Sequence, residues 1–185
     1  MIKKIIFFIQ EAPFTGTEKH KVAQSRPAAP PRPDITHHIL LTIIDSPLYK
    51  SNRCKIYVKT VNNILIEINE GTRIPRTTTR FVGLMKDVLR KLKIKDEDKT
   101  LMRVVKSKID FPPGAVKIGM SRKGERISKE HFIANDVVLY VNAKQRGEDV
   151  FDDVDVLMKV SDYELSGAAA VGKAIFFIED ILNVF

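Results

Sequence analysis

The first part of the chain alternates between apolar runs and polar, proline-rich connections. Residues 1–9 form a short apolar run with a basic start, which predicts a buried first strand rather than a secretory signal. Residues 11–32 are polar and contain several prolines, so they predict a long loop or arm without regular backbone. The apolar stretch 35–44 follows Asp34 and stops before Pro47, which predicts a buried helix with Asp34 as its N-cap.

The next part of the chain shows first a strand pattern and then a helical one. Two β-branched runs, 54–61 and 64–68, flank Asn62-Asn63, which predicts a hairpin with a two-residue turn. Pro75 suits the first turn of a following helix. The apolar positions of this helix recur at helical spacing and are Phe81, Leu84, Met85, Val88 and Leu92. We expect the helix to end in the charged segment 93–99.

The second half contains three short apolar runs, 116–120, 137–141 and 156–160. Runs of this kind, followed by loops that contain glycine, are typical of parallel strands buried on both faces. The tail 166–185 predicts a helix that is apolar on nearly every side, which one subunit of this size would struggle to bury alone. We therefore expect a single α/β domain over residues 1–185 that forms a homodimer.

The composition is that of a folded, globular protein with a basic surface. Hydrophobic residues make up 44% of the chain and charged residues 29%, which excludes a disordered chain and a membrane protein. The 31 Lys and Arg against 23 Asp and Glu give a net charge of +8. This excess favours a polyanionic partner, nucleic acid first. A heavily charged, thermophile-like surface that needs no ligand is the alternative.

Several classes of functional site are excluded by what the sequence lacks. A single cysteine, Cys54, cannot form an intramolecular disulfide, and the four scattered histidines give no zinc-site spacing. We therefore expect no metal. The sequence also has no dinucleotide-binding glycine pattern after a strand, no phosphate-binding loop with Lys-Ser/Thr and no nucleophile elbow.

Three arginines, Arg73, Arg76 and Arg80, fall around the expected start of the helix after Pro75. Arg76 and Arg80 would share one helical face, where like charges repel, and cations at a helix N-terminus oppose the macrodipole. This arrangement costs stability unless an anion binds there, and the phosphate backbone of RNA would supply one. The alternative is a solvated basic face with acidic partners elsewhere.

The segment Arg32-Pro33-Asp34 precedes the first expected helix. In the structural interpretation Asp34 caps the helix and Arg32 pairs with it. In the functional interpretation Arg32 faces RNA while Asp34 fixes the loop that presents it. Two later loops, 142–147 and 160–165, follow or precede buried elements, where open α/β sheets bind ligands.

Several of these segments together resemble one known family, the pseudouridine N(1)-specific methyltransferases of small-subunit ribosomal RNA in archaea and eukaryotes, also called the Nep/Emg ribosome-biogenesis family. The resemblance covers about residues 31–185 and is densest in the first half. It rests on residues 32–37, 41–47, 66–69, 72–76 and 80–85.

The resemblance implies an α/β fold of the SPOUT class, in which the C-terminal segment forms a trefoil knot. It implies a β-α-β-like extension, here about residues 50–80, that binds RNA. Residues 116–185 would form the knotted region for cofactor binding and dimerisation. In this family the cofactor is S-adenosyl-L-methionine, which leaves as S-adenosyl-L-homocysteine.

Carried over by position, the cofactor-binding residues are those of three loops at the ends of the late strands. They are Met120, Ser121, Asn142, Gly147, Val160, Ser161, Asp162, Tyr163, Glu164 and Leu165. The sequence departs from the family at Asn142, where glycine is usual, and at Glu164, which replaces the proline of a Tyr-Pro-Leu-Ser turn.

The implied activity is methylation of ring nitrogen 1 of a pseudouridine in small-subunit rRNA, with a role in ribosome biogenesis. Arg32, Arg73, Arg76 and Arg80 would hold RNA, and Asp34 would act as an organiser or as the proton acceptor. The alternatives are a non-catalytic rRNA-binding assembly factor and a tRNA methyltransferase. We expect action in the cytoplasm of an archaeon, with rRNA and other ribosome assembly factors as partners and no membrane contact.

Overall fold

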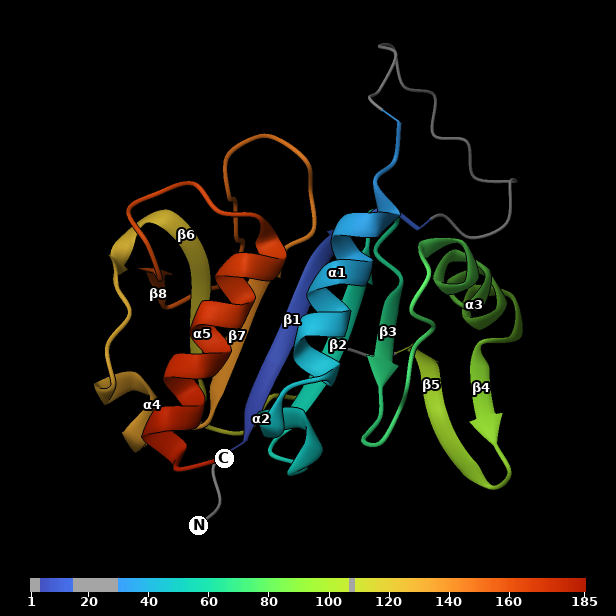
Figure 1. The fold of residues 1–185 in the computed structure, drawn as a ribbon, viewed down its shortest axis with the longest axis horizontal. Helices are drawn as coiled ribbons and strands as arrows, with labels where there is room; N and C mark the ends of the chain where they lie inside the picture. Colours follow the sequence, from blue (N-terminus) through green and yellow to red (C-terminus); the bar gives the residue numbers. More distant parts are fainter. Residues whose placement is uncertain (1–3, 15–29, 107–108) are drawn as a thin grey trace.

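In the computed structural model, which describes residues 4–14, 30–106 and 109–185, the strands of these ranges form one eight-stranded sheet (Figure 1). The strand order is β4-β5-β3-β2-β1-β7-β6-β8. The strands are β1 (Ile5–Ala12), β2 (Cys54–Thr60), β3 (Leu65–Ile68), β4 (Lys93–Asp96), β5 (Lys99–Val105), β6 (Val116–Arg126), β7 (Val137–Asn142) and β8 (Val156–Lys159). Most of the expected arm 11–32 lies outside the described residues.

Strand direction divides the sheet into two parts. β8, β6, β7, β1 and β2 pair in parallel, which confirms the predicted parallel strands. β3, β5 and β4 continue the sheet beyond β2 in antiparallel pairing. The predicted hairpin of β2 and β3 therefore joins the two parts, because β2 lies beside β1 in the parallel part. The RNA-binding role expected for residues 50–80 stays a prediction.

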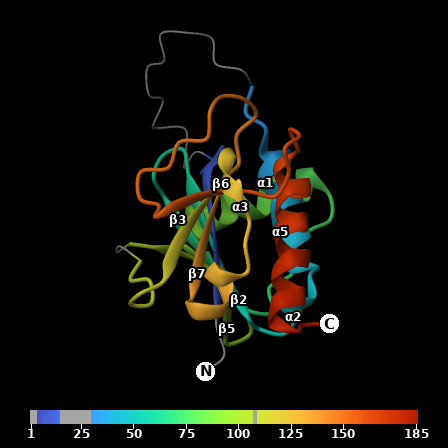
Figure 2. The ribbon, with the colours of Figure 1, turned by 90° about the vertical axis from the view of Figure 1, so that its left-hand side faces the viewer.

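The helices of the described residues cover one face of this sheet (Figure 2). They are α1 (Pro33–Ile44), α2 (Pro47–Lys50), α3 (Thr78–Lys91), α4 (Glu130–Ala134) and α5 (Gly167–Leu182). Ile39, Phe81, Phe132 and Val171 from four of them are fully buried against strand residues such as Phe7. None of these helices is long and apolar enough to cross a membrane.

The opposite face of the sheet carries a smaller apolar cluster around Phe8 and Tyr140, whose ring centroids lie 4.8 Å apart. Phe111 and Phe151, from the segments that connect the strands, pack on Tyr140 edge to face. Every residue of β7 is consequently buried. This burial explains why residues 137–141 are a continuous apolar run rather than an alternating one.

The N-cap predicted for α1 is wrong. The helix begins at Pro33, and its N-cap is Arg32, which makes no side-chain cap hydrogen bond. Proline suits the first helical position because its fixed φ matches the helix and its missing N–H is not needed there. Asp34 therefore lies inside the first turn, and its carboxylate accepts hydrogen bonds from Arg32 instead of capping.

The hairpin between β2 and β3 is confirmed, but its turn has three residues rather than two. The backbone N–H of Thr60 donates to the carbonyl of Ile64, so residues 61–63 form the loop. Asn63 alone of the three adopts a positive φ, 59°. A three-residue loop that ends in a left-handed residue is the next most common hairpin connection after the two-residue turns.

Both ends of α3 differ from the prediction. The helix begins at Thr78, three residues after Pro75, and Leu92 is its C-cap with φ 62° rather than a core position. Phe81, Met85 and Val88 are buried as expected. The charged segment that follows the helix forms β4 and a turn. It is a strand because it pairs with β5 and because Ile94 of β4 packs on the core.

Strand β6 makes a short excursion where it passes β8. Met158 pairs with both Met120 and Glu125, so residues 121–124 leave the regular pairing between these two positions. The excursion closes with Gly124 directly against the backbone of Leu157, where a Cβ would lie 2.3 Å from the carbonyl carbon. Glycine is the residue that allows two backbone segments to approach this closely.

We expect Gly124→Ala to lower the free energy of unfolding by about 1–3 kcal/mol or more, since the added methyl would overlap a backbone that cannot move aside. Gly83→Ala is the matched control, because a Cβ at this position of α3 meets no atom within 4 Å. It should raise the free energy of unfolding by about 0.5–1 kcal/mol. Urea titration followed by circular dichroism measures both, and equal effects would contradict the close approach.

Candidate functional site

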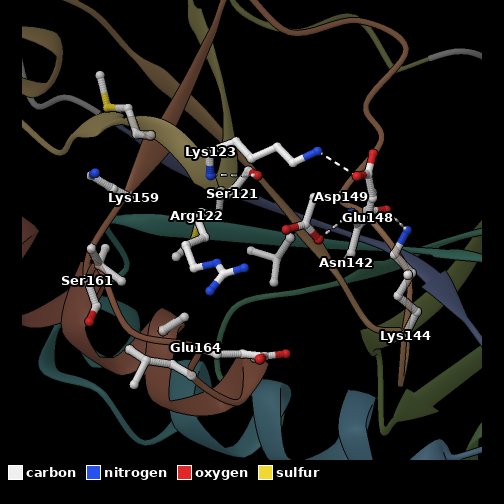
Figure 3. Close-up of a pocket in the computed structure, with 18 of the residues that line it drawn as sticks. Ser121, Arg122, Lys123, Asn142, Lys144, Glu148, Asp149, Lys159, Ser161 and Glu164 are labelled. Carbon is white, nitrogen blue, oxygen red and sulfur yellow. Dashed lines mark hydrogen bonds and ion pairs between the residues drawn. The ribbon is translucent and has the colours of Figure 1, made fainter.

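A cavity of about 660 Å³ opens beside residues 120–123 of β6 and the carboxyl ends of β7 and β8, near the N-terminus of α5 (Figure 3). This volume is typical of sites for small molecules and cofactors. The cavity is lined by nine of the ten predicted cofactor residues: Met120, Ser121, Asn142, Gly147, Val160, Ser161, Tyr163, Glu164 and Leu165. The tenth, Asp162, does not line it and pairs with Lys159 at 2.8 Å. Parallel pairing thus brings together three loops that are far apart in the sequence.

Local hydrogen bonds shape two of these loops. The backbone N–H of Lys123 donates to Ser121 Oγ at 3.3 Å, and the backbone N–H of Tyr163 donates to Ser161 Oγ at 3.1 Å. Serine side chains commonly fix a turn in this way. In the middle loop, Gly147 has φ 101°, a conformation that side chains of other residues disfavour.

Asn142, at the end of β7, anchors the loop that follows this strand. Its side-chain oxygen accepts a hydrogen bond of 2.6 Å from the Gln10 amide, and its own amide donates to Asp149 at 3.0 Å. The Gln10 amide also donates to the carbonyl of Val150 at 2.8 Å. Asn142 is 9% exposed, so these bonds are made largely out of water. The residue that departs from the family pattern therefore holds the cavity loop to β1.

Ion pairs fix two lysines at the rim of the cavity. Lys123 Nζ lies 2.6 Å from Glu148, and this hydrogen bond lowers the pKa of that carboxyl. Lys144 Nζ lies 3.1 Å from Glu11 and also donates to the carbonyl of Glu148. Exposed pairs of this kind contribute little stability each, so their main effect is to position the loop.

Arg32 and Asp34 form a bidentate ion pair at the N-terminus of α1. Arg32 Nε donates to one carboxylate oxygen at 2.9 Å and Nη2 donates to the other at 2.7 Å. The hydrogen bond with Arg32 lowers the pKa of Asp34. Figure 1 shows this end of α1 at the same edge of the sheet as the cavity loops.

The other predicted RNA-binding arginines do not gather on one helical face. Arg76 lies before α3 and pairs with Asp45, the C-cap of α1, through both carboxylate oxygens. Arg73 and Arg80 are exposed. The predicted repulsion between Arg76 and Arg80 on a common helix is wrong, because α3 begins only at Thr78.

His37 joins α1 to the segment that carries these arginines. It is 1% exposed, and its Nε2 lies 2.7 Å from the carbonyl oxygen of Pro75 while its Nδ1 lies 3.1 Å from Thr78 Oγ1. The ring stacks on Phe81 with centroids 4.5 Å apart. Because a carbonyl oxygen only accepts, Nε2 carries a proton and donates. This buried contact fixes the arginine segment against α1.

The described residues contain no group of three or more His, Cys, Asp and Glu side chains that could hold a metal ion. Burial raises the pKa of Cys54 to about 12, so its thiol is not an activated nucleophile at neutral pH. Sequence reasoning missed Gln10, His37, Arg122 and Asp149. Gln10 and Asp149 are polar residues at a strand end and in a loop, and only the fold brings them to Asn142.

A model of the EMG1/NEP1 methyltransferase family matches residues 16–179. The chain belongs to this family. It is 37% identical over 171 residues to the ribosomal RNA small subunit methyltransferase NEP1 of Candida albicans, covering 86% of this chain and 64% of that protein. It is 39% identical over 160 residues to the protein of the same name from Mus musculus, covering 83% of this chain and 66% of that protein. The chain therefore spans about two thirds of the length of these relatives.

The crystal structure of Archaeoglobus fulgidus Nep1 bound to S-adenosylhomocysteine superposes with a TM-score of 0.79. The sequence identity is 21%, and the match covers 98% of this chain and 99% of the other. This likeness shows the fold, and it confirms the SPOUT-type α/β architecture expected for the EMG1/NEP1 family.

We expect Asn142→Ala to lower the free energy of unfolding by about 1–3 kcal/mol, because Gln10 and Asp149 each lose a partly buried hydrogen bond. Gln145→Ala, in the same loop and exposed, is the control and should change it by less than about 0.5 kcal/mol. Urea unfolding measures stability, and limited proteolysis should show faster cleavage within residues 143–150. Unchanged cleavage in Asn142→Ala would contradict the anchoring role.

Proposed function

We propose that this protein transfers the methyl group of S-adenosyl-L-methionine to ring nitrogen 1 of a pseudouridine in small-subunit rRNA. The observation that carries this proposal is the cavity beside β6, β7 and β8, which nine of the ten predicted cofactor residues line. The names of the relatives, ribosomal RNA small subunit methyltransferase NEP1, support the reaction and the class of substrate. The S-adenosylhomocysteine held by the Archaeoglobus fulgidus neighbour supports the cofactor and its product.

The residues that line the cavity fit such a cofactor. Apolar side chains of Met120, Val160 and Leu165 offer surface for an adenine ring, and backbone groups of the loops offer hydrogen bonds. Asn142 does not fill the site, because its side chain is engaged with Gln10 and Asp149. The replacement of glycine by asparagine is therefore compatible with binding. The bound cofactor would supply an electrophilic methyl group on a sulfonium.

The substrate chemistry explains the selectivity that we propose. Pseudouridine is joined to its sugar through carbon, so its ring nitrogen 1 carries a proton, whereas in uridine this nitrogen holds the sugar. In the reaction the bond from nitrogen 1 to the methyl carbon forms and the sulfur–methyl bond breaks. The proton of nitrogen 1 leaves to solvent, and the by-product is S-adenosyl-L-homocysteine. Fixed cations near the base would stabilise the negative charge that develops on its oxygens.

The Arg32–Asp34 pair favours the organiser role for Asp34 over the role of proton acceptor. Both carboxylate oxygens accept hydrogen bonds from Arg32, and the lowered pKa of Asp34 makes it a weaker base. We propose that Asp34 orients the Arg32 guanidinium toward RNA at the edge of the sheet where the cavity opens. The half-exposed Arg32 keeps its remaining N–H groups available for a phosphate or base.

The arginines define a path for RNA along α1. Arg32 lies at the N-terminus of this helix, and Arg76 is held by Asp45 at its C-terminus. The twelve residues of α1 span roughly 18 Å at 1.5 Å per residue, several phosphates of an RNA strand. We propose that Arg32 contacts RNA near the target base, while Arg73, Arg76 and Arg80 contact flanking phosphates.

The proposal includes the trefoil knot. β8 lies at the edge of the sheet beyond β6, yet α5, which follows it, packs on α1 and α4 on the helical face. The excursion of residues 121–124 around β8 is consistent with a loop through which the chain passes.

The proposal also includes the homodimer, acting in the cytoplasm with other assembly factors. Phe176 on α5 is 76% exposed. It lines a second cavity with Ala169, Gly172 and Phe177, and the charged residues Arg126 and Lys173 also line it. An exposed aromatic side chain of this kind suits a contact with a second subunit.

The test is methyl transfer from labelled S-adenosyl-L-methionine to two matched small-subunit rRNA hairpins, one with pseudouridine and one with uridine in the loop. We expect label in the pseudouridine hairpin and none in the uridine hairpin, because only pseudouridine has a free nitrogen 1. Binding of both hairpins without transfer to either would overturn the proposal in favour of a non-catalytic assembly factor.

A variant that removes one charge tests whether Arg80 contacts RNA. Arg80→Ala should weaken binding of both hairpins and lower the slope of log affinity against log salt by about 1. Lys86→Ala on the same helix removes an equal, exposed charge as the control. Equal losses of RNA affinity in the two variants would show that binding depends on net charge alone and not on Arg80.

A further inference from the structure

The charged side chains that line the cavity divide into those with partners and those without. Lys123 pairs with Glu148, Lys144 with Glu11, and Lys159 with Asp162. The Asp149 carboxylate accepts a hydrogen bond from Asn142. In the part of the chain that the structure describes, three charged residues that line the cavity make no side-chain hydrogen bond or ion pair: Arg122, Arg146 and Glu164.

Arg122 and Glu164 reach the cavity from two different loops. Arg122 follows Ser121 in the excursion of β6, and Glu164 lies in the loop between β8 and α5. Figure 3 shows the Arg122 guanidinium inside the cavity, with the Glu164 carboxylate also directed into it. Both side chains are exposed. The Arg122 guanidinium and the Glu164 carboxylate thus face the same cavity without forming an ion pair.

We propose that Arg122 and Glu164 bind the zwitterionic amino-acid end of the cofactor, Arg122 taking the α-carboxylate and Glu164 the α-ammonium. This inference rests on the proposed function, since it assumes that S-adenosyl-L-methionine occupies the cavity. It gives a binding role to Glu164, the residue that replaces the family's proline.

The physical basis is that charged hydrogen bonds are stronger than neutral ones and depend on geometry. A guanidinium presents parallel N–H donors that match the two oxygens of a carboxylate. A carboxylate accepts in the same way from an ammonium group. Removal of one partner should therefore weaken binding about tenfold or more.

The experiment uses isothermal calorimetry with three ligands that share the adenosine and thioether parts. S-adenosyl-L-homocysteine has both the carboxylate and the ammonium group. Its decarboxylated analogue, S-adenosyl-3-thiopropylamine, keeps the ammonium group alone, and 5′-methylthioadenosine has neither. The wild-type chain and the variants Arg122→Ala, Glu164→Gln and Arg146→Ala are each titrated with all three ligands.

We expect Arg122→Ala to weaken S-adenosyl-L-homocysteine about tenfold or more and to change the other two ligands by less than about twofold. Glu164→Gln should weaken S-adenosyl-L-homocysteine and the amine and leave 5′-methylthioadenosine unchanged. Retained binding of 5′-methylthioadenosine shows that each variant is folded. Arg146→Ala, which removes the same charge from the same cavity, should show no selective loss.

The assignment is overturned if Arg122→Ala weakens all three ligands equally or none of them, or if Arg146→Ala shows the selective loss instead. It is also overturned if Arg122→Ala weakens hairpin RNA but not S-adenosyl-L-homocysteine, because the guanidinium would then bind a phosphate. Failure of the wild-type chain to bind any of the three ligands would count against the proposed function itself. The two failures are therefore distinguishable.

Discussion

The parallel pairing of β1, β7, β6 and β8 is the constraint on which the rest of the structure depends. Strands that run in the same direction end at the same edge, so the excursion of β6 and the loops after β7 and β8 meet there although the sequence separates them by up to 45 residues, from Met120 to Leu165. Burial of the strands on both faces fixes their register against the helices on one side and the Phe8–Tyr140 cluster on the other. The cavity follows from this pairing.

Hydrogen bonds and ion pairs then fix the shape of the loops. Some charged side chains of the described cavity lining are left without a partner. The Gln10–Asn142–Asp149 hydrogen bonds tie the longest cavity loop to β1, and ion pairs hold the lysines at the rim. The Arg32–Asp34 ion pair lies at the N-terminus of α1, which Figure 1 shows at the same edge of the sheet as the cavity loops. His37 holds the segment with the other arginines against α1. We propose that α1 organises the approach of RNA and that the strand ends hold the cofactor.

Much of the fold can be predicted from apolar patterns, because buried strands and helices depend on local periodicity. The strands at 137–141 and 156–160 and the C-terminal helix lie close to where the sequence places them. β4 is different: its charged residues 93–96 show no strand pattern, and it forms because β5 supplies hydrogen bonds on one side and α3 a surface for Ile94. The predicted N-cap of α1 was also wrong, because Pro33 rather than Asp34 decides where this helix begins.

Nine residues of the cavity lining could be carried over from the family resemblance, but the contacts that hold the site could not. Nothing local in the sequence connects Gln10 with Asn142 or Arg76 with Asp45, because these contacts join elements 132 and 31 positions apart. Arg122 was not singled out for the same reason, since its place in the cavity depends on the excursion of β6 around β8.

We propose that residues 120–123 of β6 and the loops after β7 and β8 hold the cofactor. Amide hydrogen exchange of the chain with and without S-adenosyl-L-homocysteine tests it most directly. The account predicts slower exchange within residues 120–123, 142–149 and 160–166, and no change in β4 and β5. Protection confined to other parts of the chain, or none in the presence of bound ligand, would contradict it.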